Sequence, residues 1–112
     1  MFNGGHVVIY TADAEADRRF FRDVIGLECV DVGDGWLIFS LPQSEIAFHP
    51  HGTSTAHEFY FMCDDIQAVC STLNKEGVDY SEPVDEGWGI LSKFTLPGGG
   101  EVGFYQPRHA RP

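Results

Sequence analysis

The sequence predicts an α+β fold in which two βαβββ modules form a paired, incompletely closed eight-stranded sheet around a cleft. Matching landmarks predict this duplication, because they recur at offsets of about fifty residues, a spacing typical of internal repeats. The landmarks are Asp34-Gly35-Trp36 with Glu86-Gly87-Trp88, and Leu41-Pro42 with Leu96-Pro97. In addition, segments 42–50 and 97–107 each contain a Pro-led turn and a short strand that starts with Glu and stops at a proline.

Length and composition predict one globular domain over residues 1–112. The chain is 43% hydrophobic and 21% charged, which excludes a disordered protein, and no apolar run approaches the length of a membrane span. The N-terminus lacks a basic segment followed by an apolar stretch, so we expect a cytoplasmic location. Cys29, Cys63 and Cys70 lack paired metal-ligand spacing and are interpreted as reduced, mostly buried thiols.

The charge balance is strongly acidic. Seven Lys and Arg stand against 17 Asp and Glu, which gives a net charge of −10 with neutral His. No basic patch precedes the short tail, so nucleic acid and membrane surfaces are not expected partners. The acidic field favours cations or cationic small molecules as partners, although it can also serve solubility alone. Both interpretations remain open at this point.

The first module spans residues 1–50. Its first strand is predicted at residues 6–10, followed by a helix that Asp13 caps and Gly26 ends. The apolar face of that helix consists of Ala16, Phe20, Phe21 and Val24. Three short strands are then predicted near residues 28–32, 36–41 and 45–49, separated by turn-forming segments.

The second module spans residues 57–107, after a polar connector at 51–56 and before a tail at 108–112. A strand is predicted at 58–63, and Asp64 or Asp65 caps a helix that runs toward Gly77 with apolar residues at helical spacing. Further strands are expected near 79–82, 89–95 and 101–105. Each sheet has one face to cover, so two such sheets are expected to pair around a shared cleft that holds the functional site.

The run from Asp13 to Leu27 resembles the first helix and following turn of the vicinal oxygen chelate superfamily. This superfamily includes glyoxalase I, bleomycin resistance proteins and extradiol dioxygenases. The resemblance extends to Asp64-Asp65-Ile66 and to the strand after Pro97-Gly98-Gly99-Gly100. It implies the fold but not the reaction type, since related proteins on one fold carry out different chemistry.

The resemblance also implies positions for metal ligands on the first and last strands of each module. His6 and Glu58 match two of them, with His57 as the alternative if the register shifts by one residue. Ala47 and Gly103 match the other two and cannot bind metal, which leaves an incomplete set. Glu45 and His49 flank Ala47, and Glu101 and Tyr105 flank Gly103, at displacements of roughly 6–7 Å along the strands. The catalytic residues are not identified.

Two functions are compatible with these residues. The first is a small-molecule-binding protein of the bleomycin-resistance type that has a degraded metal site, needs no cofactor and sequesters a cationic ligand. Its expected cleft residues are His6, Glu45, His49, Glu58, Tyr60, Glu101 and Tyr105. The alternative is a lyase or dioxygenase that uses a divalent metal (Zn, Ni, Mn or Fe) on a vicinal-oxygen substrate.

Two further expectations follow from the resemblance. A homodimer is expected, because related small proteins complete their clefts between subunits and because apolar sheet edges need cover. Gly103 is expected to leave open space in the cleft, so that Gly103→Glu would add a metal ligand without disturbing the strand.

Overall fold

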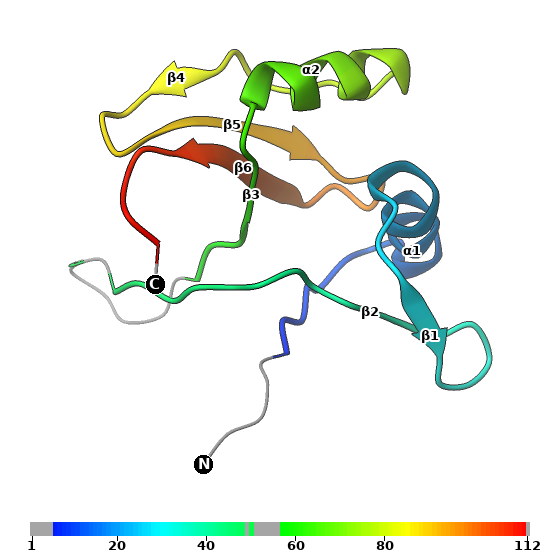
Figure 1. The fold of residues 1–112 in the computed structure, drawn as a ribbon. Coiled ribbons are helices and arrows are strands. Elements are labelled where there is room, and N and C mark those ends of the chain that lie inside the picture. Colours follow the sequence, from blue (N-terminus) through cyan, green and yellow to red (C-terminus); the bar gives the residue numbers. More distant parts are fainter. Residues whose placement is uncertain (1–5, 49, 51–56, 112) are drawn as a thin grey trace.

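The computed structural model describes residues 6–48, 50 and 57–111, which form two helical segments and two separate sheets (Figure 1). Helix α1 (Ala14–Phe20) continues into a π-helical turn, η1 (Phe21–Ile25), and helix α2 spans Ile66–Lys75. Strands β1 (Cys29–Asp31) and β2 (Leu37–Phe39) form an antiparallel pair. The larger sheet has the order β3-β6-β5-β4, with strands Tyr60–Met62, Glu101–Pro107, Gly89–Thr95 and Val84–Asp85.

Strand β6 is central in the larger sheet. It pairs in parallel with β3 and antiparallel with β5, so that Tyr60 and Lys93 both lie opposite Gly103. Helix α2 covers one face of this sheet (Figure 1). There its buried side chains join the buried residues of β5, β6 and the adjoining turn in one core: Ile66, Cys70, Leu73, Phe94, Leu96, Val102 and Phe104.

Side chains alternate across a strand, so the neighbours of these core residues point to the opposite face. We call this opposite side the open face. Its residues on β3, β5 and β6 include Tyr60, Met62, Leu91, Lys93, Glu101, Gly103 and Tyr105. The open face is therefore the surface of the larger sheet that is available to a ligand or a partner.

Both helices begin and end where the sequence predicts. Asp13 accepts a hydrogen bond from the backbone N–H of Ala16, and Asp65 accepts from those of Gln67 and Ala68. Gly26 ends η1 in the left-handed conformation, with φ of 80°. The π-helical turn was not predicted. It closes with hydrogen bonds from the N–H groups of Gly26 and Leu27 to the carbonyl of Phe21.

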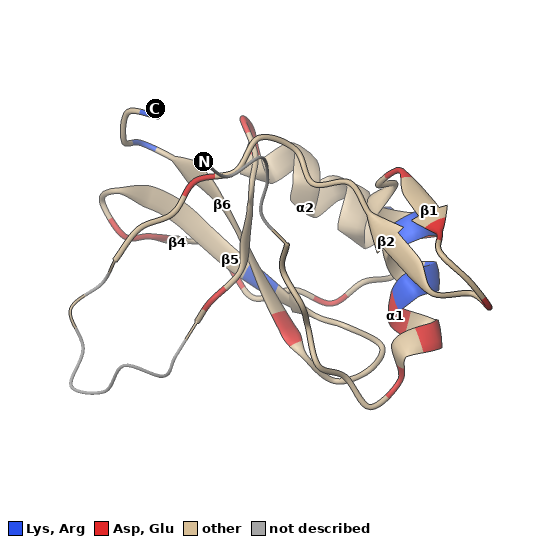
Figure 2. Cartoon of the chain, turned by 90° about the horizontal axis from the view of Figure 1, so that it is seen from below, with Lys and Arg blue, Asp and Glu red and all other residues tan. Residues whose placement is uncertain are grey.

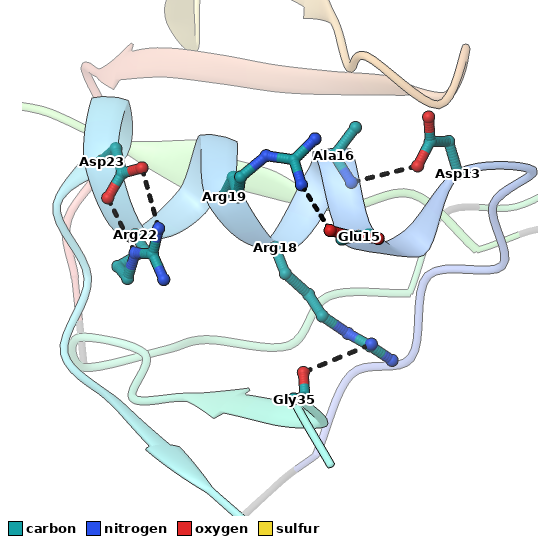
Figure 3. A network of polar contacts seen from close by, with 8 residues as sticks. All are labelled: Asp13, Glu15, Ala16, Arg18, Arg19, Arg22, Asp23 and Gly35. Carbon is teal, nitrogen blue, oxygen red and sulfur yellow. Dashed lines mark hydrogen bonds and ion pairs between the residues drawn. The ribbon is translucent and has the colours of Figure 1, made fainter.

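Three of the seven basic residues, Arg18, Arg19 and Arg22, lie on this first helical segment, whereas acidic positions are spread along the chain (Figure 2). Arg19 pairs with Glu15 at 2.8 Å, and Arg22 pairs with Asp23 at 2.7 Å (Figure 3). The guanidinium of Arg18 lies 4.6 Å from the ring centroid of Trp36 and donates to the carbonyl of Gly35. Arg18 thereby ties the β1–β2 turn to α1.

The first half of the chain packs against the second through aromatic rings. Phe20 lies 5.8 Å from Phe94, and Phe21 lies 6.0 Å from Phe61, between ring centroids. Phe21 is buried and also contacts Phe39 of β2. These contacts connect α1 and the small sheet to the core that α2 and the larger sheet share.

A buried carboxylate connects the same two parts. Asp17 on α1 is 6% exposed, and its Oδ1 accepts a hydrogen bond of 2.7 Å from the N–H of Gly98. Its Oδ2 has no hydrogen-bond partner among the described residues. A Cβ at Gly98 would lie 1.8 Å from Thr11 Oγ1 and 2.8 Å from Asp17 Oδ2, so this contact requires glycine.

The predicted first and last strands of the first module are not strands. Residues 6–10 and 45–48 form no β-ladder in the part of the chain that the structure describes, and His49 lies outside it. Their large apolar side chains are exposed: Val7, Val8, Tyr10, Ile46 and Phe48. Propensity favours extended backbone there, but a strand also needs a neighbour to pair with, and the described residues provide none.

The second module also differs in one strand. The strand predicted at 79–82 is reduced to a single bridge between Tyr80 and Phe94, and the edge strand is β4. The described residues thus form six strands in two sheets, so the eight-stranded pairing is not present in the described chain. None of the described helices is long and apolar enough to cross a membrane.

Candidate functional site

A cavity of about 480 Å³ lies over part of the open face. We call it the acidic pocket, because three carboxylates and one lysine are among its lining residues. Those residues include Glu58, Tyr60, Glu86, Leu91, Lys93, Glu101 and Gly103. Lys93 and Glu101 pair at 3.1 Å, with both side chains 58% exposed, so Lys93 offsets one of the three negative charges.

Tyr60 is fixed in this pocket by Glu58. Its hydroxyl donates a hydrogen bond of 2.5 Å to Glu58 Oε2. This bond, together with burial and the charge of Glu58, raises the pKa of Tyr60 to about 12. Tyr60 is therefore a neutral donor at physiological pH, and Glu58 is the negative end of the pair.

The ring of Tyr60 lies directly over Gly103. A Cβ built on Gly103 would come within 2.3 Å of Tyr60 Cδ1 and 2.4 Å of Cε1. An aromatic side chain on one strand can cover a glycine on the neighbouring strand in this way, because glycine leaves room for the ring. The sequence predicted open space at Gly103. This prediction is wrong, because the ring of Tyr60 fills that space.

The opposite end of the open face is built around Tyr105. Its ring contacts Tyr60 at 5.8 Å, Trp88 at 5.3 Å and His109 at 5.8 Å, between centroids. Burial first, and then the charge of Glu45, raises the pKa of Tyr105, whereas the charge of Arg111 lowers it. We call Glu45, Trp88 and Tyr105 the aromatic end, against which His109 and Arg111 lie.

The thiol beside this face is not a nucleophile. Cys63 Sγ donates to the carbonyl of Tyr105 at 3.4 Å. Burial raises the pKa of Cys63 to about 11, so the thiolate is scarce at neutral pH. Burial also raises the pKa of Cys70, which lies on the core-facing side of α2.

The model of the Glyoxalase/Bleomycin resistance protein/Dioxygenase superfamily matches residues 4–104. The chain belongs to this superfamily. No curated protein sequence matches it. The resemblance inferred from the Asp13–Leu27 run and the terminal strand is therefore confirmed.

Solved structures of this superfamily's fold are similar over nearly the whole chain. The antibiotic binding protein TnmS3 from Streptomyces sp. CB03234 is 22% identical, with 96% of this chain and 99% of that chain covered and a TM-score of 0.68. Lactoylglutathione lyase from Agrobacterium tumefaciens is 18% identical, with 90% of each chain covered and a TM-score of 0.68. At these identities the similarity establishes the fold and leaves the activity open.

The structure brings together four of the predicted cleft residues. Glu58, Tyr60 and Glu101 line the acidic pocket, and Tyr105 lies beside Tyr60. Glu45 is placed near Tyr105 through its pair with Arg111. His6 is exposed and is not among the residues that line the acidic pocket, and His49 falls outside the described residues.

The site also contains residues that the sequence did not predict. Lys93 could have been found from strand alternation, because it stands opposite Gly103 on the same face. Arg111 and His109 had no such signal, since nothing in a short tail indicates where it lies. Their contacts with Glu45 and Tyr105 come from tertiary structure alone.

The described residues do not fit the metal site that the superfamily implies. No three His, Cys, Asp or Glu side chains gather in a suitable arrangement in the described part of the chain. Gly103 supplies no donor atom, and Glu58 is hydrogen-bonded to Tyr60. A catalytic divalent ion normally has about three protein ligands, more than these described residues bring together.

Proposed function

We propose that this protein binds a small cationic molecule on the open face of the larger sheet. The observation that carries the proposal is the arrangement of Tyr60. Its ring covers Gly103, and its hydroxyl is held by Glu58, so an aromatic ring and a carboxylate lie side by side in the acidic pocket. Aromatic faces and carboxylates both attract organic cations.

The size and charge of the acidic pocket support the same class of ligand. Its volume of about 480 Å³ is typical of sites for small organic molecules. Lys93 pairs with Glu101, which leaves Glu58 and Glu86 to face a positive group. The antibiotic-binding protein among the similar structures is consistent with a binder, although only the fold is shared.

A cation and an anion of the same shape test this proposal. Calorimetric titration should detect binding of benzamidinium and little or no binding of benzoate. Glu58→Gln should weaken benzamidinium binding by about tenfold, because a charge-assisted interaction is lost. Glu76→Gln, at the exposed end of α2, is the matched control and should leave binding unchanged. Equal binding of both probes, or no effect of Glu58→Gln, would contradict the proposal.

Calorimetric titration with metal ions tests the alternative function, a metal-dependent lyase or dioxygenase. We expect Zn²⁺, Ni²⁺ and Mn²⁺ to bind weakly, because His6 and Glu58 are an incomplete ligand set. If the protein instead holds one equivalent of metal at nanomolar affinity and His6→Ala abolishes it, the enzyme function replaces the binder.

We further propose that a second copy of the chain covers the exposed apolar segments at residues 6–10 and 45–48. The apolar side chains of these segments are exposed in the single chain, among them Val8 at 62%, Ile46 at 82% and Phe48 at 89%. Their cover by a second copy would remove this apolar surface from water. Residues 1–112 then act as one domain per subunit, and a cytoplasmic location stays a prediction.

Light scattering tests the dimer. We expect twice the 12.4 kDa of one chain at micromolar concentration. Val8→Asp should shift the mass toward one chain, because Val8 is 62% exposed in the single chain and the proposed second copy would bury the new charge. Val30→Asp, at a similarly exposed position within the paired β1–β2 sheet, is the matched control. A mass of one chain for the unmodified protein would refute the dimer.

A further inference from the structure

The C-terminal tail, residues 108–111, lies against the aromatic end of the open face. The backbone N–H of Arg108 donates to the carbonyl of Trp88 at 2.9 Å, and its guanidinium pairs with Asp85 at 2.5 Å. His109 Nε2 lies 3.0 Å from the hydroxyl of Tyr105. Figure 1 shows the C-terminal end beside the extended segment that precedes the connector, and there Arg111 Nε donates to Glu45 Oε1 at 2.5 Å.

The pair of Arg111 and Glu45 differs from the other ion pairs in the described residues. The Glu45 side chain is 16% exposed and that of Arg111 is 39% exposed, whereas every other paired side chain is at least 47% exposed. A carboxylate this deeply placed needs a cationic or donor partner, because its desolvation is costly when it is unpaired. Glu45 is thus placed to bind a positive group and is not a fully solvated surface carboxylate.

The surroundings of Glu45 suit a planar cation. Tyr105 lies close enough that Glu45 and Arg111 both affect its hydroxyl, and the rings of Trp88 and His109 contact Tyr105. A guanidinium is planar, forms directional hydrogen bonds with carboxylates and stacks on aromatic rings. The tail therefore places at the aromatic end a cationic group, the guanidinium of Arg111, of the class that the open face is proposed to bind.

We propose that the aromatic end is a guanidinium-recognising subsite of the ligand site and that the chain's own tail occupies it. This inference rests on the proposed binding of a cationic ligand. A ligand that carries a guanidinium has to displace Arg111 from Glu45 before it can bind there. Because the tail is tethered, it competes at a high effective concentration, in the millimolar range for a short connection, and lowers the apparent affinity for the ligand.

The test uses the full chain and Nα-acetyl-arginine amide, a probe whose sole charge is its guanidinium. Calorimetry should show that Arg111→Ala raises the affinity for this probe by about tenfold, since Glu45 becomes available. Arg111→Gln, which keeps most of the side chain but not its charge, should raise it as well. Adding Glu45→Gln to Arg111→Ala should abolish the gain. Arg22→Ala is the matched control, because Arg22 pairs with Asp23 on the first helical segment.

The outcomes separate this inference from the proposed function. Equal affinity of the unmodified protein and both Arg111 variants would overturn the role of the tail. Absence of probe binding in all variants, with benzamidinium still bound through Glu58, would overturn the subsite and leave the proposed function standing. Absence of binding of either cation in every variant would overturn both.

Discussion

Gly103→Ala is expected to destabilise the protein by about 1–3 kcal/mol, the usual cost of forcing extra volume into a packed site. The added Cβ would lie 2.3 Å from the ring of Tyr60, which Glu58 and Tyr105 hold in place. The ring would have to leave the sheet and lose its hydrogen bond with Glu58. Urea unfolding followed by circular dichroism measures this change.

Two controls identify the contact as the cause. Gly100→Ala is the matched substitution, because its Cβ would meet its nearest neighbour, Leu96 Cδ1, at 3.9 Å, and we expect a change within about 0.5 kcal/mol. In a Tyr60→Ala background, Gly103→Ala should lose most of its cost. If Gly103→Ala is as destabilising without the ring as with it, the close approach of Tyr60 is not the reason that position 103 is glycine. Gly103→Glu is expected to displace the ring in the same way.

Asp17→Ala is expected to destabilise the protein by about 2 kcal/mol. It removes a charge-assisted hydrogen bond and leaves the N–H of Gly98 without its partner. It also loosens the contact between α1 and the turn before β6. Asp17→Asn should cost less than about 1 kcal/mol, because its amide oxygen can still accept from Gly98 and the buried charge with the unpaired Oδ2 disappears.

Asp23→Ala is the matched control for this series. Asp23 is on the same helical segment, but its side chain is 57% exposed and pairs with Arg22 at the surface, so we expect little or no change in stability. Denaturant midpoints of the three variants, at constant slope, give the comparison. Equal stability of Asp17→Ala and Asp23→Ala would show that the Asp17–Gly98 bond contributes little to holding the two parts together.

The helices could be predicted from the sequence because their signals are local. Asp13 and Asp65 cap them, and Gly26 ends the first helical segment, as expected. The strands at 28–32, 36–41, 58–63, 89–95 and 101–105 were predicted to within a few residues for the same reason. Residues 6–10 and 45–48 form no strand with any other described residue, since propensity describes one segment and a β-ladder requires two.

The candidate site was predictable only as far as strand alternation allows. Alternation placed Glu58 on the same side of the chain as Tyr60, and Glu101 on the same side of its strand as Tyr105. The pairing of β3 with β6 then puts these sides on one face of the sheet. The position of the Tyr60 ring over Gly103 depends on the register between two strands distant in the sequence. No local pattern contains that register, so the glycine was interpreted as a vacant ligand position.

The aromatic contacts between the two halves of the chain have a consequence for its synthesis. The first helical segment is translated well before its partners Phe94 and Gly98, and Gly98 follows Asp17 by 81 residues. Until those residues emerge, Phe20 lacks the ring of Phe94, and Phe21 has only the rings of Phe39 and Phe61 to pack against. The nascent N-terminal half therefore exposes apolar side chains until these partners have been synthesised. Such exposure favours aggregation and binding by chaperones.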